Sequence, residues 1–264
     1  MTERLGLFPL GMTLLPGQLL PVHVFEPRYR DLLRDLVQGA FDPGTGRAAR
    51  RRPRFGVIAI RVGSEVGAHT LPDLHRIGCV AEVLEVEQHR DGTSDLMAVG
   101  RERFELLGLD PSAGTSYLTG RVRWLEEPPG SAAPELSREV RELFDRYRRI
   151  VTVSAADRWI EHDESEEGPA DARGADGGAL EPEPEASADD AATTRLPNDP
   201  TVLSWAVAGS MVLHAGERQQ LLEDADAGAR LRRLRRLLRR ELALLPLLPS
   251  LPATELARQP PDPR

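Results

Sequence analysis

Lysine is absent from this sequence of 264 residues, and all 34 of its basic residues are arginines. The phosphate-binding loop G-x-x-x-x-G-K-[ST] needs a lysine, and Ser–Lys dyads and Schiff-base enzymes use one as base or nucleophile. Composition alone therefore excludes P-loop ATP hydrolysis, Ser–Lys peptidase chemistry and Schiff-base catalysis.

Cysteine is almost absent as well. The single cysteine, Cys79, lies in the apolar segment RIGCVAEVLEVEQ, so neither an intramolecular disulfide nor a cysteine-based metal cage can form. No charged segment followed by an apolar one opens the chain, and the longest apolar helix candidate, near residues 202–213, is too short to span a bilayer. These features predict a protein without a membrane segment in the reducing cytoplasm.

Signatures of catalysis are also missing. The six histidines are scattered, without an H-E-x-x-H motif and without a pair at metal-ligand spacing on one predicted helix. No serine lies in a G-x-S-x-G elbow, and GTGR at residues 44–47 lacks the strand-to-helix context of a dinucleotide fingerprint. We therefore expect no enzyme, no bound metal and no cofactor.

The first half of the chain carries the patterns of short strands. Alternating residues or short apolar runs occupy residues 54–62, 75–88, 94–109 and 117–125. The dipeptide Asp91-Gly92 between the second and third runs is a hairpin signal. We predict a β-barrel over residues 1–126.

A strand pattern in this half runs directly into a helix pattern. The alternation of residues 20–24 predicts a strand, and the apolar spacing of residues 29–37 predicts a helix. Pro27 suits the first helical position because it lacks an N–H and has a fixed φ. Glu26 is expected to pair with Arg30, four residues later. On this evidence the join is a structural device.

In the second half of the sequence, apolar residues recur at the spacing of helix faces. Residues 134–160 and 198–246 are predicted to form a helical bundle, with Asp199 as an N-cap and Pro200 in the first helical position. Leucines repeat along one face of the last helix. The predicted fold class is therefore α+β, with a β-barrel followed by a helical bundle.

Low-complexity sequence interrupts and ends this half. Between Glu161 and Asp199 the chain has 13 acidic and 2 basic residues and almost no large apolar side chain. Such a composition cannot bury enough apolar surface to order the chain. We predict a disordered acidic insert at 161–197 and a proline-rich tail at 247–264.

Two groups of arginines could meet phosphates. One lies in the loop that contains Arg50, Arg51 and Arg52, and the other is assigned to the polar side of the last helix. The second group comprises Arg230, Arg232, Arg233, Arg235, Arg236, Arg239 and Arg240. A solvated helix face explains such a run equally well, and no aromatic residues interleave for base stacking. The candidates for anion binding are Arg50, Arg51, Arg52, Arg232, Arg236 and Arg239.

Several segments resemble, in the same order, the N-terminal substrate-binding domain of ATP-dependent Lon proteases. They are GLFPLGMTLLPGQLLPVHVFEPRYRDLL, FGVIAI, IGCVAEV, AVGRERFEL and RQQLLEDADAGARLRRLRRLLRREL. The resemblance implies a barrel like that of pseudouridine synthases and archaeosine transglycosylases (PUA-like), followed by a helical bundle. Phe25, Glu26, Pro27, Arg28 and Tyr29 would form the family's junction between barrel and helix, with a structural role.

The resemblance also implies a function. Because the ATPase and peptidase modules of a full Lon protease do not occur in this sequence, it resembles a stand-alone substrate-binding domain. Such a domain would bind unfolded or tagged polypeptides without catalysis, with an ATP-dependent protease as a further partner. The alternative is RNA binding through the arginine clusters, since PUA-like barrels also serve nucleic acids, and a steep salt dependence of binding would indicate it.

Overall fold

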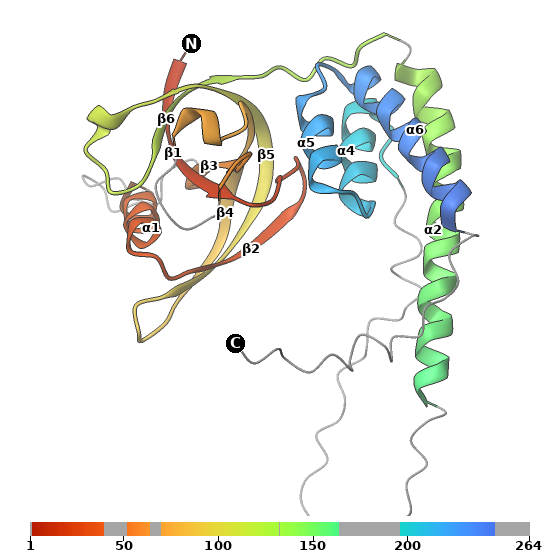
Figure 1. The fold of residues 1–264 in the computed structure, drawn as a ribbon, viewed down its shortest axis with the longest axis horizontal. Coiled ribbons are helices and arrows are strands. Elements are labelled where there is room, and N and C mark those ends of the chain that lie inside the picture. The colour runs from red at the N-terminus through yellow and green to blue at the C-terminus, as the bar shows by residue number, and fades with distance from the viewer. Residues whose placement is uncertain (1, 40–51, 64–69, 132, 164–195, 246–264) are drawn as a thin grey trace, which may run out of the picture.

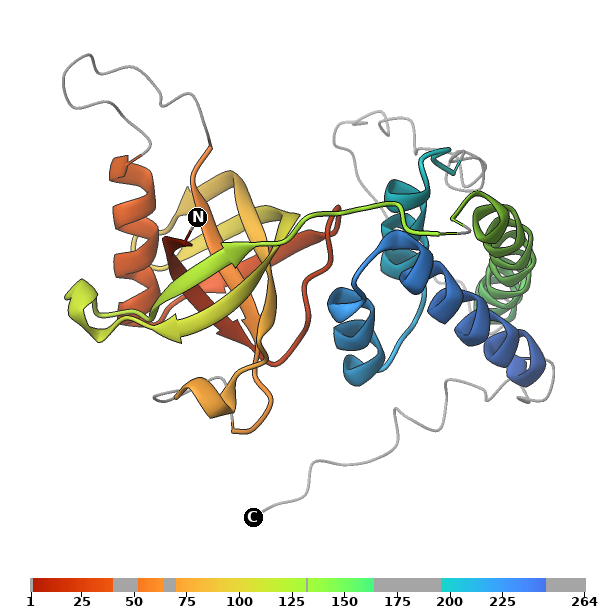
Figure 2. The same cartoon turned by 90° about the horizontal axis from the view of Figure 1, so that it is seen from above.

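The computed structural model describes residues 2–39, 52–63, 70–131, 133–163 and 196–245. They form two parts that lie side by side, strands with one helix first and four helices second (Figure 1). Seen from above, α1 flanks the barrel on the side away from the other helices (Figure 2). Most of the predicted acidic insert, residues 164–195, and the whole predicted proline-rich tail lie outside the described residues.

Six strands build the first part. They are β1 (Thr2–Leu10), β2 (Leu19–Val24), β3 (Arg54–Ala59), β4 (Ile77–Gln88), β5 (Ser94–Leu109) and β6 (Thr119–Trp124). Strands β5, β4, β3, β1 and β6 close into a ring because β6 pairs with both β1 and β5. Among these six described strands only β1 and β3 pair in parallel. The predicted barrel is confirmed, and so is the α+β order of barrel before helices.

The barrel is filled by side chains that alternate inward from the ring strands. All five ring strands contribute to one apolar cluster, made of Leu7, Ile58, Val80, Phe104, Leu106 and Val122 together with Leu74. Gly78 leaves room for the ring of Phe104, since a Cβ there would lie 2.6 Å from the Val57 carbonyl oxygen and collide with that ring. The interior of the ring is therefore filled by packed side chains.

Helix α1 (Pro27–Gly39) begins at Pro27, as predicted. Its buried face packs on the outside of the barrel, where the Tyr29 ring stacks on Phe8 with 3.9 Å between centroids. The predicted pair between Glu26 and Arg30 is wrong. Glu26 instead accepts a hydrogen bond from Arg28 Nε at 3.0 Å, because the Arg30 guanidinium reaches across to Gly92 in the β4–β5 hairpin.

Four helices make up the second part: α2 (Ala133–Asp163), α4 (Pro200–Ser210), α5 (Ala215–Glu223) and α6 (Ala227–Leu244). Helix α2 packs along α6, and α4 contacts both. The Asp199 carboxylate accepts the N–H groups of Thr201 and Val202, both at 2.9 Å, so the predicted N-cap is confirmed. Helix α2 continues three residues beyond the predicted end at residue 160.

The two parts share one apolar core, which runs from the barrel face under α1 into the leucine face of α6. Helix α5 lies against β4 and brings polar contacts to this junction. Leu231, Leu234 and Leu238 of α6 are fully buried, as the leucine repeat predicted. None of the described helices is both long and apolar enough to cross a membrane.

Candidate polypeptide-binding edge

Strand β2 is an open edge of the sheet. It pairs with β5 from Leu19 opposite Val99 to Val24 opposite Ser94. Within the described chain no strand pairs with its other side. An open edge offers unpaired backbone N–H and C=O groups to another extended chain. In this part of the barrel the backbone itself is thus a potential binding surface.

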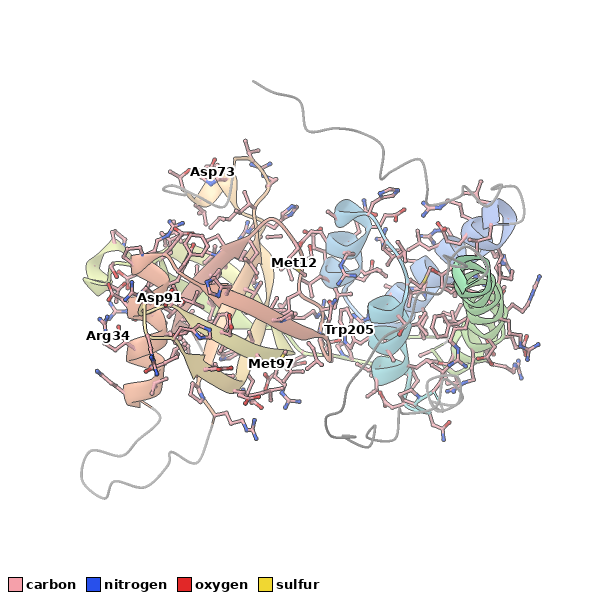
Figure 3. All side chains as sticks on the ribbon, turned by 90° about the horizontal axis from the view of Figure 1, so that it is seen from below. Met12, Arg34, Asp73, Asp91, Met97 and Trp205 are labelled. Carbon is pink, nitrogen blue, oxygen red and sulfur yellow. The ribbon has the colours of Figure 1, made fainter. Side chains whose placement is uncertain are left out.

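The outward face of β2 adds apolar side chains to this edge. Leu19 is 58 % exposed and Phe25, directly after the strand, is 59 % exposed. Met97 of β5, labelled in Figure 3, is the cross-strand partner of Pro21. We call Leu19, Pro21, Phe25 and Met97 the β2 apolar strip. Leu19, Pro21 and Phe25 alternate along the exposed side of β2, and such a row of apolar groups beside an open edge is a candidate interaction surface.

A shallow pocket of about 110 Å³ opens beside β2, between the end of β1, the end of β2 and the start of α1. It is lined by Phe8, Pro9, Leu10, Val22, His23, Val24, Phe25, Glu26 and Tyr29. Most of these side chains are apolar. The pocket therefore suits a hydrocarbon side chain better than a charged group.

The five junction residues differ in what they contact. Tyr29 is buried against Phe8, and the guanidinium carbon of Arg28 lies 4.5 Å from the centroid of the Tyr29 ring. The Glu26 carbonyl accepts the N–H of Tyr29 at 3.0 Å, which starts the helix. Glu26, Arg28 and Tyr29 thus hold the turn together, and Pro27 is the first residue of the helix. Phe25 points to solvent and belongs to the β2 apolar strip.

The arginines of α6 are largely neutralised by acidic partners. Arg233 contacts Asp224 at 2.9 Å, Arg235 contacts Glu139 at 3.0 Å, Arg239 contacts the same Glu139, and Arg240 contacts Glu217 and Glu241. Of the predicted anion-binding residues of this helix, Arg232 and Arg236 make no ion pair with a described residue. In the loop, Arg52 is exposed, whereas Arg50 and Arg51 lie outside the described residues.

Arg230 was assigned to the polar side of α6, and this is wrong. Its side chain is fully buried, and it contacts Glu127 at 2.9 Å. Arg103 of β5, which is also buried, pairs with the same Glu127 and donates to the Leu222 carbonyl at 2.7 Å. Trp205 lies beside both arginines. This cluster joins barrel and bundle and has no access to a large ligand.

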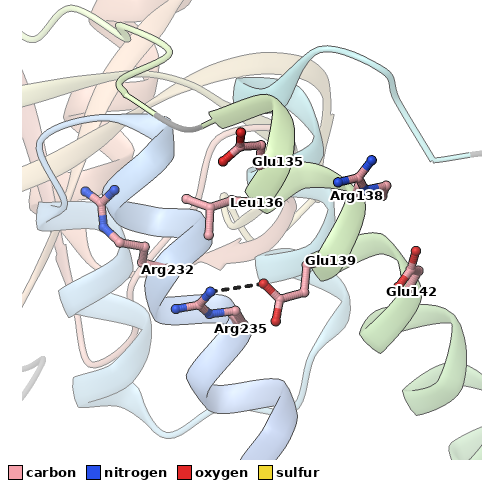
Figure 4. Close-up of a pocket in the computed structure, with 7 residues that line it drawn as sticks. All are labelled: Glu135, Leu136, Arg138, Glu139, Glu142, Arg232 and Arg235. Atoms are coloured by element: carbon pink, nitrogen blue, oxygen red, sulfur yellow. Dashed lines mark hydrogen bonds and ion pairs between the residues drawn. The ribbon is translucent and has the colours of Figure 1, made fainter.

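A pocket of about 570 Å³ lies between α2 and α6 (Figure 4). It is lined by Glu135, Leu136, Arg138, Glu139, Glu142, Arg232 and Arg235. Three carboxylates balance three guanidinium groups, and Arg235 is held by Glu139. Because no excess of positive charge remains, the pocket does not have the field that phosphate binding needs.

Cys79, the one cysteine of the sequence, is not placed to act as a catalytic nucleophile. Cys79 is fully buried in β4, and its burial raises the pKa of the thiol. A thiol with a raised pKa is not a nucleophile.

The structure does bring together three residues that sequence reasoning kept apart: His23, His89 and Asp95. His89 and Asp95 flank the predicted Asp91-Gly92 turn, so the hairpin register was a usable signal. The approach of His23 depends on the long-range pairing of β2 with β5, for which the sequence carries no such signal.

Comparison with known proteins gives the family. The model of the ATP-dependent protease La (LON) substrate-binding domain matches residues 4–240. The chain belongs to this family. Over 128 residues, 47 % and 48 % of this chain, it is 27 % identical to the Lon proteases of Parabacteroides distasonis and Porphyromonas gingivalis, respectively. These alignments span 14 % and 13 % of the two proteases, so only a small part of each is compared.

Solved structures agree on the fold. A Lon N-terminal domain protein from Xanthomonas campestris is 20 % identical, with a TM-score of 0.50, over 88 % of this chain and 96 % of that one. The N-terminal domain of a Lon protease from the Mycobacterium avium complex is 16 % identical, with the same TM-score and coverage. The resemblance noted in the sequence is thus confirmed for family and fold.

Proposed function

We propose that this protein binds unfolded or tagged polypeptides in extended form along the open edge of β2, without catalysing a reaction. The observation that carries the proposal is the juxtaposition of a free strand edge, the β2 apolar strip and the apolar pocket at Phe25. Membership of the Lon substrate-binding domain family supports a role in recognising substrates.

The open edge of β2 and the apolar pocket would contribute to recognition in different ways. Strand addition at β2 would supply backbone hydrogen bonds that are independent of the bound sequence. The pocket of about 110 Å³ is smaller than the roughly 150 Å³ cavity that holds a benzene molecule, so it suits a single small apolar side chain. Such a site favours extended chains with an apolar residue and has little further selectivity.

The partner that fits this role is an ATP-dependent protease, which would receive the bound polypeptide. The matching family model is that of the substrate-binding domain, which supports a binding role rather than an enzymatic one. The absence of lysine from the sequence also argues against ATP turnover by a P-loop within these 264 residues.

Binding of a fluorescent, reduced and carboxymethylated model polypeptide tests the proposal. Replacing Leu19 or Phe25 by serine should weaken binding about tenfold, which is 1.4 kcal/mol, since a buried Leu or Phe side chain contributes about 1.5–3 kcal/mol. The matched control is Val212→Ser, because Val212 is 83 % exposed on the helical part. Equal affinities for all three variants and the wild type would exclude the β2 strip as the site.

RNA binding is the alternative function, and the salt dependence of binding distinguishes it from polypeptide binding. Apolar docking should change little between 50 and 200 mM salt, whereas binding through several phosphates falls by about 10³–10⁵ over that interval for six to ten contacts. The pairing of Arg233, Arg235, Arg239 and Arg240 with carboxylates favours the polypeptide. A steep salt response with single-stranded RNA as the probe would reverse that choice.

A further inference from the structure

Two exposed side chains and one half-buried side chain converge on one point of the barrel surface, next to Phe25. Asp95 of β5 lies directly opposite His23 of β2 in the strand register. His23 Nδ1 is 2.7 Å from Asp95 Oδ1, and His89 Nε2 is 2.8 Å from Asp95 Oδ2. The three ligand atoms all lie within 4.8 Å of one another. One carboxylate thus holds two imidazoles facing each other.

Two imidazoles and one carboxylate form a donor set for borderline divalent metals. Zn²⁺ binds imidazole nitrogen and carboxylate oxygen at about 2.0–2.2 Å, which puts the ligand atoms of a tetrahedral site about 3.4 Å apart. The two hydrogen-bonded distances here are slightly shorter than this, and the two imidazole nitrogens lie within 4.8 Å of each other, so shifts of about 1 Å in the side chains would admit the ion. All three side chains are at least one-third exposed and so have room to move.

Charged groups of both signs lie near the cluster, since the Arg30 guanidinium approaches Gly92 of the β4–β5 hairpin. Glu87 of β4 is the direct cross-strand partner of Asp95, so a second carboxylate stands next to the cluster. The backbone that carries the three ligands is held in place, because β2, β5 and β4 are hydrogen-bonded neighbours and the hairpin is closed between His89 and Thr93. Rigid strands that present the ligands lower the ordering cost of binding an ion.

The geometry points to a Zn²⁺-type divalent metal site made by His23, His89 and Asp95. The ion would replace the hydrogen bonds that now join the imidazoles to the carboxylate, and it would tie β2 to the β4–β5 hairpin. Three protein ligands leave a fourth position open, beside the apolar pocket. The site does not depend on the proposed polypeptide binding.

Calorimetric titration of the metal-stripped full chain with Zn²⁺ tests this site. We expect one Zn²⁺ per chain with an affinity in the micromolar range, and Co²⁺ should give visible absorption bands of a low-symmetry nitrogen and oxygen site. His23→Gln, His89→Gln and Asp95→Asn should each weaken Zn²⁺ binding by more than about 10-fold. Substituting a residue that only hydrogen-bonds a metal ligand already lowers metal affinity about 10- to 100-fold, and these three substitutions remove the ligands themselves.

Two other histidines are matched controls. His75 faces a single carboxylate, Glu223, at 3.4 Å, so His75→Gln should leave Zn²⁺ affinity unchanged. His162 lies in the acidic part of the sequence, so His162→Gln is the control for Zn²⁺ binding there and should also leave the affinity unchanged. The inference is overturned if Zn²⁺ produces no binding heat, or if affinity survives the three site substitutions. Far-UV circular dichroism of each variant without metal verifies that the fold is retained.

Discussion

The guanidinium carbon of Arg230 lies 3.5 Å from the centroid of the Trp205 ring, inside the contact between α6 and α4. Arg230 Nε donates to Ser204 Oγ at 2.8 Å, and a second nitrogen donates to the Glu127 carboxylate at 2.9 Å. Burial lowers the pKa of Arg230 to about 10, so the side chain is still charged at neutral pH. One cation thus connects α6, α4 and the segment that leaves the barrel.

Replacing Arg230 by methionine should destabilise the protein by about 3 kcal/mol. Removing one partner of a buried ion pair typically costs about 3–5 kcal/mol, and the lower end applies because Glu127 keeps Arg103 and is 26 % exposed. The free energy of unfolding in urea measures the loss. Arg236→Met on the exposed side of the same helix is the control, with a change within about 0.5 kcal/mol. Equal losses in both variants would contradict the role of the buried contact.

The position of Arg230 shows why the sequence predicts helices better than their contacts. The leucine period of α6 correctly predicted its buried face, because a 3.6-residue repeat is a local property. The burial of Arg230 depends on Glu127, which is 103 positions away in the chain. A long-range partner of this kind leaves no periodic signal, so an arginine near the edge of the apolar face was read as solvated.

The same limit applies to the candidate sites. The hairpin at Asp91-Gly92 was predictable, because its turn residues are local, and with it the approach of His89 to Asp95. The open edge of β2 was not predictable. The barrel closes by pairing of β6 with β5, which leaves β2 outside the ring. Closure of a barrel is a property of all its strands and cannot be read from any one of them.

Acid should destabilise the protein through Glu82. Hydrogen bonds from Arg54, and then from Arg101, hold the pKa of Glu82 below its usual value of 4.5, although burial opposes them. The unfolded chain therefore takes up the proton first as the pH falls, and stability that is fully present above pH 4.5 is lost through the lower, folded pKa.

In Glu82→Gln, the unfolding free energy should depend less on pH between about 5 and 3 than in the wild type. The control is Glu85→Gln on the same strand, since Glu85 is exposed. Parallel pH profiles of Glu82→Gln and the wild type would show that the ion pair does not shift the titration.

Replacing Gly100 or Gly209 by alanine should change the stability of the protein in opposite directions. A Cβ at Gly100 would collide with the Leu15 carbonyl, whose carbon would be 3.0 Å away, whereas a Cβ at Gly209 in α4 meets nothing within 4 Å. Gly100→Ala should cost about 1–3 kcal/mol by overpacking, and Gly209→Ala should add up to about 1 kcal/mol through helix propensity. Thermal midpoints of the two variants check this. A midpoint for Gly100→Ala at or above that of the wild type would mean that the loop before β2 yields easily.

Gln219 links the bundle to the barrel by hydrogen bonds that are nearly closed to solvent. Its Oε1 accepts from Thr13 Oγ1 at 3.1 Å, and its Nε2 donates to the Ile77 carbonyl at 3.1 Å and to Glu223 at 2.8 Å. Thr13 and Gln219 are each 3 % exposed. Each group that loses its partner here is left without water to replace it.

Thr13→Val and Gln219→Leu should therefore each destabilise by about 1–3 kcal/mol, while the double variant should lose less than the sum. The difference, a coupling of about 0.5–3 kcal/mol, arises because the second substitution removes a group that the first had already left without its partner. Urea unfolding of the four proteins in the cycle measures it. Gln220→Leu in place of Gln219→Leu is the control cycle and should be additive, since Gln220 contacts Arg233 and not the barrel. Additivity in both cycles would mean that the contact between Thr13 and Gln219 does not hold barrel and bundle together in solution.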